Sequence, residues 1–175
     1  ILLCFAVFAN GCGPRISISN LSPHSNEDVG YDSNDDGTND VVSIYKNGYV
    51  VKAVYDRNFD GKFDLTEYYQ NGIPSNYESD ENFDGIPDLW ATMKFGYVAK
   101  LKIDSDFNGI PDGEYEYKNG IVSTGLWRPN GSNAPVRLEL YTNGVCYIEL
   151  IDSQGDGVFE QTNRYSFYGM IEKTE

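Results

Sequence analysis

Residues 104–127 read DSDFNGIPDGEYEYKNGIVSTGLW, and a unit of this kind decides the fold. Its first half, from Asp104 to Asp112, is an acidic loop with oxygen-bearing side chains at alternate positions and a glycine at the sixth. Its second half places the pair Asn119-Gly120 between two strand-like runs. Similar units recur through residues 32–175 with a step of 24 residues. A fixed period of this size indicates a repeat protein.

The Asn-Gly pair predicts a β-hairpin, because a type I′ turn needs a positive φ at both central residues. The matching segments are Tyr45-Lys46-Asn47-Gly48, Tyr69-Gln70-Asn71-Gly72, Tyr117-Lys118-Asn119-Gly120 and Tyr141-Thr142-Asn143-Gly144, with Met93-Lys94-Phe95-Gly96 as a looser copy and Tyr165 to Gly169 as a copy with one extra residue. Each repeat is therefore predicted to run loop, strand, turn, strand. Two-residue turns make the flanking strands antiparallel neighbours.

Pairing between successive hairpins would give a meander of about twelve strands, on the order of 55 Å wide at ~4.8 Å per strand. All turns would then lie on one edge of the sheet and all acidic loops on the other, ~10 Å apart. In a solenoid with one repeat per coil the loops would be only ~5 Å apart, and divalent ions in them would repel each other more strongly. We therefore expect an all-β repeat protein, an antiparallel meander of β-hairpins joined by calcium loops. A sheet this wide is expected to be twisted or rolled.

The acidic loops carry the ligand pattern of a calcium site. Such loops supply side-chain oxygens from positions one, three and five, a main-chain carbonyl from position seven and a further oxygen, often through water, from position nine, while glycine at position six permits the sharp turn. The predicted ligands at position one are Asp32, Asp56, Asp80, Asp104 and Asp152, and at position three Asn34, Asn58, Asn82, Asp106 and Gln154. At position five they are Asp36, Asp60, Asp84, Asn108 and Asp156. At position seven they are Thr38, Lys62, Ile86, Ile110 and Val158, and at position nine Asp40, Asp64, Asp88, Asp112 and Glu160.

One loop is complete. Residues 56–67, DRNFDGKFDLTE, end on Glu67 at position twelve, where calcium loops carry a bidentate carboxylate. The other loops have Ser43, Ala91, Tyr115 or Asn163 at that position. We therefore predict that the loop of residues 56–67 binds Ca²⁺ most tightly.

These loops also admit a plainer interpretation, as turns in which Asp and Asn side chains cap their own backbone. A plain turn gains nothing from so much negative charge, so five such loops favour Ca²⁺ as the cofactor. Mg²⁺ fits less well, because it prefers fewer protein ligands and keeps its waters.

The sequence resembles two known patterns. The loops are similar to EF-hand-like D-x-[DN]-x-[DN]-G calcium loops outside helical EF-hands, as in some bacterial surface proteins. The Tyr-x-Asn-Gly segments resemble MORN-type β-hairpin repeats. Together the resemblances cover about residues 32–175. They imply calcium binding and hairpin architecture, without the helix-opening switch of helical EF-hands.

The slot at residue 128 departs from the pattern. It reads Arg128-Pro129-Asn130-Gly131-Ser132-Asn133-Ala134-Pro135-Val136, without an aspartate. We interpret it as a repeat that kept the fold and lost the metal. An exposed Trp127 beside it would favour a partner site there, whereas a buried Trp127 would mark a decayed repeat.

The first residues predict export and a lipid anchor. Residues 1–11 are apolar and too short to span a bilayer, and resemble the remnant of a signal peptide. Ala9-Asn10-Gly11-Cys12 resembles a bacterial lipoprotein cleavage box, which implies lipidation at Cys12; a buried N-terminal strand is the alternative. Residues 12–31 are predicted to be the lipidated cysteine and a flexible tether, and residues 32–175 a domain of six repeats. The resemblance implies attachment to the bacterial envelope, at the outer membrane or cell surface.

Two further features bear on function. The tyrosines that precede the turns recur on one face of the predicted sheet, either as a core ladder or as an aromatic surface for a glycan or a protein. Cys146 occupies a valine position of other repeats, which favours a small buried residue over a reactive thiol.

Composition narrows the function. The formal charge of −14 excludes nucleic acid as a natural partner, because that partner needs a basic face. Outside the predicted tether the chain has no histidine, and it has no Gly-x-Ser-x-Gly motif. We therefore predict that the chain is not an enzyme. We expect a calcium-binding surface lipoprotein that acts as a scaffold or adhesion module for a host or bacterial surface ligand. The alternatives are a sheet that binds a protein partner in secretion or toxin neutralisation, and a calcium-dependent hydrolase.

Overall fold

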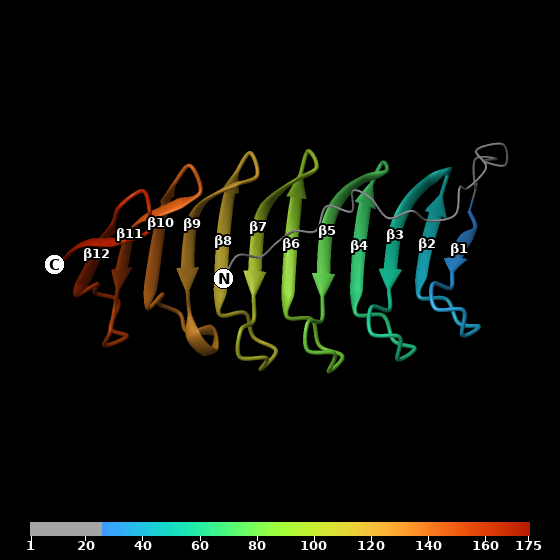
Figure 1. Ribbon diagram of the computed structural model, residues 1–175, viewed down its shortest axis with the longest axis horizontal. Helices are drawn as coiled ribbons and strands as arrows, with labels where there is room; N and C mark the ends of the chain where they lie inside the picture. Colours follow the sequence, from blue (N-terminus) through green and yellow to red (C-terminus); the bar gives the residue numbers. More distant parts are fainter. Residues whose placement is uncertain (1–25) are drawn as a thin grey trace.

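The computed structural model describes residues 26–175. They form one sheet of thirteen strands whose order in space is their order in the sequence (Figure 1). The predictions for the signal remnant, the lipidated Cys12 and most of the tether fall on residues 1–25 and lie outside the described residues. In residues 26–175 no helix is long and apolar enough to span a bilayer.

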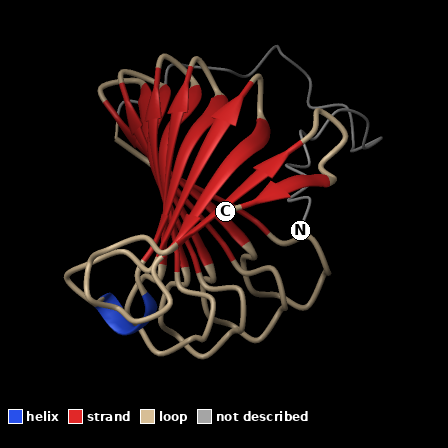
Figure 2. Cartoon of the chain, turned by 90° about the vertical axis from the view of Figure 1, so that its left-hand side faces the viewer, coloured by secondary structure: helices blue, strands red, loops and turns tan. Residues whose placement is uncertain are grey.

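Every strand pairs antiparallel with the next one along the chain. The strands are β1 (Asp28–Tyr31), β2 (Val41–Lys46), β3 (Tyr49–Tyr55), β4 (Leu65–Gln70), β5 (Ile73–Ser79), β6 (Leu89–Lys94), β7 (Tyr97–Ile103), β8 (Gly113–Lys118), β9 (Ile121–Trp127), β10 (Arg137–Thr142), β11 (Val145–Ile151), β12 (Gln161–Tyr165) and β13 (Ile171–Thr174). A 3₁₀ turn, η2 (Pro129–Gly131), is the remaining element of the described chain. The predicted all-β antiparallel meander is confirmed. The sheet stays open and strongly twisted, and does not close on itself (Figure 2).

The hairpin turns have the predicted backbone. Asn119 and Gly120 have φ of 54° and 78°, as a type I′ turn requires. The other Asn-Gly pairs and Phe95-Gly96 show the same two positive angles. Each of these hairpins has a register shift just before the turn, as between Glu116 and Tyr117, which is a β-bulge. The turns lie on one edge of the sheet and the acidic loops on the other (Figure 1).

One predicted boundary is wrong. Strand β1 lies inside residues 12–31, the segment predicted to be tether. Its residues pair with β2, from Asp28 opposite Ile44 to Tyr31 opposite Val41. The sheet therefore begins with half a hairpin before the first acidic loop. The run is too short to show strand periodicity in the sequence, and pairing with β2 stabilises it.

The apolar core is small and lies on one face. Leu89, Ala91 and Leu101 are buried together, and Tyr77, Met93, Val98, Ile103, Tyr115 and Tyr117 pack against them. We call this side the tyrosine face, because the tyrosines before the turns lie on it. A single layer has no second sheet to cover it, so most of its side chains remain partly exposed.

Backbone hydrogen bonds continue the ladder into the loop edge. The amide of Asp64 donates to the carbonyl of Tyr55 at 2.8 Å, and the amide of Asp80 donates to the carbonyl of Asp64 at 2.8 Å. Asp40, Asp64, Asp88 and Asp112 all accept such a bond from the next repeat, so these ninth residues link their own repeats to the next ones. This ladder places successive loops side by side in one row (Figure 1).

Candidate metal-binding loops

The carboxylate at position one organises each acidic loop. Asp56 accepts hydrogen bonds from the amides of Phe59 and Gly61, both at 2.7 Å. These bonds require the chain to turn sharply, and Phe59 and Gly61 accordingly have φ of 63° and 84°. In three further loops the amide of the glycine at position six likewise donates to the aspartate at position one. A carboxylate has about four lone-pair sites, so these amides leave room for a further partner.

The carboxylate at position nine is anchored from the start of its own loop. The amide of Arg57 donates to Asp64 at 2.8 Å, and the Ser105 amide and hydroxyl donate to Asp112 at 3.1 and 2.8 Å. The sequence prediction missed this contact. Its signal is the serine at position two of three loops, namely Ser33, Ser105 and Ser153.

Most of the carboxylates at positions one and nine are buried, whereas Asp32 is half-buried and Glu160 is exposed. Eight aspartates of the loops belong to the buried group: Asp40, Asp56, Asp64, Asp80, Asp88, Asp104, Asp112 and Asp152. Asp104 is only 1% exposed. Burying an ionised carboxylate is costly unless a cation or several hydrogen bonds compensate.

The protein's own cations do not supply that compensation. Within residues 26–175 the ion pairs join Arg57 to Glu81, Lys100 to Glu114, Arg137 to Glu139 and Glu149, and Lys173 to Glu175. None of them includes one of the eight buried aspartates. The eight buried aspartates therefore have hydrogen bonds but no ion pair within residues 26–175.

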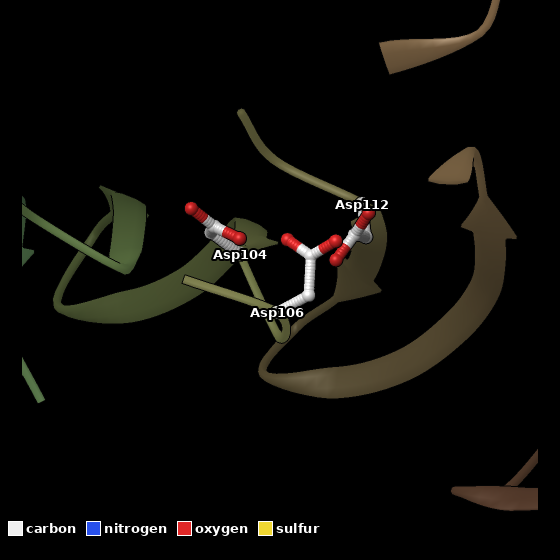
Figure 3. A group of neighbouring side chains, drawn as sticks. All are labelled: Asp104, Asp106 and Asp112. Carbon is white, nitrogen blue, oxygen red and sulfur yellow. The ribbon is translucent and has the colours of Figure 1, made fainter. Parts of the chain in front are cut away.

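Two loops bring three carboxylates together. The oxygens of Asp104, Asp106 and Asp112 lie within 4.8 Å of one another. Figure 3 shows the Asp106 carboxylate turned towards the other two. The last loop contains the second group, formed by Asp152, Asp156 and Glu160. Clustered carboxylate oxygens of this kind suit a hard divalent cation.

In two other loops position three is an asparagine whose side-chain amide donates to the carboxylate at position five. Asn82 Nδ2 donates to Asp84 at 3.0 Å in the loop that begins at Asp80, and Asn34 Nδ2 donates to Asp36 at 2.9 Å. These bonds hold the fifth carboxylate to the third side chain. In the Asp104 loop the third residue is Asp106, which has no such donor, and Asn108 instead donates to Asn130 at 3.1 Å.

The pKa values of the loop carboxylates follow this balance of burial and hydrogen bonding. Burial raises the pKa of Asp88, and the charges of Asp80 and Asp84 add to the effect. Burial also works to raise the pKa of Asp112, but hydrogen bonds led by those from Ser105 outweigh it and lower the value. The pKa of Asp152 is lowered in the same way, by backbone amides that outweigh its burial.

One buried oxygen has no partner. Asp40 is 2% exposed, and its Oδ2 accepts from the amide and hydroxyl of Ser33 at 2.7 and 2.6 Å. Its Oδ1 accepts no hydrogen bond from residues 26–175. A bound cation would satisfy this oxygen, so the donor set fits a metal here too.

Glu67, the predicted twelfth ligand, contacts the tyrosine face. Its carboxylate accepts from the hydroxyls of Tyr55 at 2.9 Å and Tyr69 at 2.5 Å. It belongs to neither group of three clustered acidic side chains found in residues 26–175. Glu67 as a metal ligand, and with it the tightest binding at residues 56–67, stays a prediction.

The position-seven residues lie beside position five. The amide of Lys62 donates to Asp60 at 2.9 Å, and equivalent bonds from Thr38, Ile86, Ile110 and Val158 reach the fifth residues of their loops. That the main-chain carbonyls of these residues bind the metal stays a prediction from the sequence.

The segment of residues 128–136 has the same backbone hydrogen bonds as the first four acidic loops but no carboxylates. The amide of Val136 donates to the carbonyl of Trp127 at 2.9 Å, as the ninth residues of the first four acidic loops do to the last residue of the preceding strand. The chain between them makes the short turn η2 (Figure 2). Trp127 is half-buried, over Gly113 and under the Arg137 guanidinium, which lies 4.9 Å from the ring centroid. It therefore matches neither the fully exposed nor the fully buried alternative.

Three of the tyrosines before the turns, Tyr69, Tyr141 and Tyr165, donate hydrogen bonds to acidic side chains of the same face. Tyr141 donates to Glu139 at 2.6 Å and Tyr165 to Glu149 at 2.6 Å. Cys146 is a free, half-buried thiol whose pKa is raised by burial. A raised pKa reduces the thiolate fraction, which agrees with a packing role.

Comparisons with known proteins add little to this geometry. No protein-family model matches the chain, and no curated protein matches it. Among solved structures it is similar to a chain in the crystal structure of accessory secretory protein 1, 2 and 3 from Streptococcus pneumoniae, with 16% identity and a TM-score of 0.42. The match covers 70% of this chain and 23% of that chain.

Proposed function

We propose that this chain is a calcium-binding, non-enzymatic repeat module in which Ca²⁺ bound along the loop edge orders the sheet. The observation that carries the proposal is the row of eight buried loop aspartates with no paired cation in residues 26–175. Ca²⁺ favours several carboxylate and carbonyl oxygens, which these loops offer. Five ions would contribute +10 against the formal charge of −14, leaving −4.

The same proposal places the module on a bacterial envelope, held by a lipid at Cys12. Support for the anchor comes from the sequence Ala9-Asn10-Gly11-Cys12. A thin sheet with two broad open faces suits a scaffold or an adhesion module, because both faces remain available to a surface ligand. Metal ions in this account have a structural role, reducing repulsion between neighbouring loops.

Thermal unfolding with and without calcium tests the proposal. A site adds ~1.4 kcal/mol of stability when Ca²⁺ is present at ten times its Kd, and five sites would add ~7 kcal/mol. For a domain of this size that corresponds to a rise in Tm of roughly 15–25 °C over the protein in EDTA. Magnesium at the same concentration should give a smaller rise, because it keeps its waters.

Calorimetric titration of the EDTA-treated protein provides the independent readout. Saturable heat with millimolar Ca²⁺ is expected. No heat and equal Tm values in calcium and EDTA would overturn the proposal. A rise in Tm that sodium chloride reproduces at equal ionic strength would also overturn it, because general screening would then explain the stabilisation.

A further inference from the structure

The face opposite the tyrosine face is apolar towards the C-terminal end of the sheet. Strands β9 to β11 place five aliphatic side chains on it, namely Leu126, Leu138, Leu140, Ile148 and Leu150. We call this group the leucine patch. All five side chains are half-buried, and residues 26–175 form one layer, so no second layer of the described chain covers them. Apolar surface that stays in contact with water favours association with a partner.

The fold itself does not require the leucine patch. Strand β8, one repeat before β10, has Glu114 and Glu116 at the positions that Leu138 and Leu140 hold in β10. Both strands nevertheless pair with their neighbours in the same antiparallel register. Leucine is therefore not needed to form a strand here, and the gathering of five aliphatic side chains on adjacent strands needs another explanation.

Unpaired charges of opposite sign flank the patch. The register forms one row across five strands, which runs Glu116, Thr124, Leu140, Ile148 and Arg164. Glu116 and Arg164 are exposed, and neither forms an ion pair within residues 26–175. The row is therefore negative at its β8 end, uncharged in the middle and positive at its β12 end.

A second row lies one step nearer the acidic loops. It runs Glu114, Leu126, Leu138, Leu150 and Thr162. Beyond its two ends lie Lys102, opposite Glu114, and Glu175, opposite Thr162. The flanks of this row are thus also opposite in sign, in the reverse order.

The other charges next to the first row already have partners. Lys100, beside its negative end, pairs with Glu114 at 2.7 Å. Lys173, beside its positive end, pairs with Glu175. The charged ends of the first row therefore remain available for a partner of opposite charge.

We propose that the leucine patch joins two copies of this chain face to face. A two-fold axis roughly along β10 places β9 of one copy over β11 of the other, and β8 over β12. The leucines of the two copies then pack together, and each Glu116 meets Arg164 of the second copy. Twisted sheets pack in this way when their strands lie within about 30° of each other.

The order of the charges selects both the axis and the partner. A two-fold contact needs a surface that complements itself, and a row with opposite charges at its ends meets that need. With an axis across the strands, β8 would instead lie over β8 of the second copy, and the glutamates would repel one another. A partner of uniform charge would be repelled at one end of the row.

The size of the surface indicates a dimer of moderate affinity. Five strands at ~4.8 Å are ~24 Å wide, and six residues at ~3.4 Å are ~20 Å long. Each copy would bury on the order of 500 Å², which is close to the lower limit for a specific interface. The tyrosine face and strands β1 to β7 stay open, and the proposal does not rest on metal binding.

Sedimentation equilibrium of the full chain measures this association. A reducing agent is present, so that disulfides between copies cannot form. Between ~1 and ~200 µM protein we expect the mass to rise from one chain to two, with a Kd on the order of 10 µM. A chain that stays a monomer overturns the proposal. A mass beyond two chains also overturns it, because a two-fold contact closes after two copies.

Charge variants test the orientation of the two copies. Glu116→Arg and Arg164→Glu should each raise Kd about tenfold, because each change brings like charges together twice in the dimer. The double variant carries both changes and should return Kd to the parent value, since opposite charges meet again. A double variant that stays as weak as the single ones would overturn the proposed axis.

A pair of glutamate variants tests the patch itself. Leu140→Glu introduces the residue that Glu116 provides one repeat earlier, so the sheet should tolerate it. Near the axis it would bring two carboxylates together and should abolish the dimer. Thr92→Glu is the matched control, because Thr92 holds the equivalent position on β6 outside the patch. It should leave Kd unchanged.

The same pair also separates this interface from others. If Leu140→Glu leaves Kd unchanged, the two copies meet elsewhere and the proposal is overturned. Equal weakening by Leu140→Glu and Thr92→Glu would show general repulsion between acidic chains, which overturns it as well. Equal Tm values for the variants and the parent at low protein concentration show that the fold of each chain persists.

Discussion

The loop of residues 104–112 and the segment of residues 128–136 occupy the same place in adjacent repeats but differ in chemistry. Both close with the same backbone bond, from Asp112 to Ile103 in one and from Val136 to Trp127 in the other, each at 2.9 Å. The first buries two aspartates and clusters a third, whereas the second has no carboxylate. The sheet therefore does not need acidic side chains to reverse direction. The presence of these side chains in five loops needs a separate cause, which we propose is calcium.

The strongest way to break this comparison is to weaken every acidic loop together. The variant replaces Asp36, Asp60, Asp84, Asp106 and Asp156 with asparagine, the residue that another loop carries at the same position. All five side chains are exposed, so the fold should tolerate the change. If each affinity falls tenfold, the calcium-dependent stabilisation falls from ~7 to ~2 kcal/mol. Tm measured in calcium and in EDTA checks this, and an undiminished difference between them would contradict it.

A second variant makes the two regions identical. Residues 104–112 are replaced by the sequence of residues 128–136. One site should be lost, lowering Tm in calcium by roughly 3–6 °C. In EDTA the variant should be at least as stable as the parent, because two buried negative charges are gone. A large loss of stability in EDTA would mean that the carboxylates serve the fold itself.

The hairpin turns on the opposite edge of the sheet provide a comparison in which no acidic loop is involved. Gly120 has φ of 78°, and a Cβ there would lie 3.0 Å from Tyr97 Cδ1. Gly120→Ala should therefore cost ~1–2 kcal/mol. Gly120→Asn should cost less for the backbone, because asparagine tolerates this region. The loss should be equal in calcium and EDTA, and a loss confined to one condition would show coupling between the two edges.

The smallest expected effect concerns the tyrosine face at high pH. Burial and the Glu67 hydrogen bond raise the pKa of Tyr55 to about 12, from an ordinary value of 10.0. Because the folded-state pKa is the higher one, the stabilisation is complete below pH 10 and is lost as pH rises towards 12. Tm measured across this window should fall, and Tyr55→Phe should flatten the fall. An identical slope in the variant would assign the loss to other groups.

The repeat architecture follows from the sequence because its signals are local. Asn119-Gly120 specifies its turn without help from distant residues, and the 24-residue step then fixes which strands are neighbours. Strand β1 was not predicted, since four residues become a strand only by pairing with β2.

The candidate site was predictable in outline but not in detail. The alternation of Asp and Asn identified the loops, whereas the direction of each side chain depends on contacts between repeats. Glu67 illustrates this, because its carboxylate accepts from Tyr55 and Tyr69. The backbone conformation of the loops was not predicted either. Phe59 has φ of 63°, although a bulky residue disfavours the left-handed region and glycine or asparagine would be expected there.

The number of calcium ions bound per chain tests the central claim most directly. Native mass spectrometry of the protein at saturating calcium should find five ions, and the exchange of residues 104–112 for the sequence of residues 128–136 should leave four. A chain that binds no calcium, or one that still binds five after the exchange, would contradict the account.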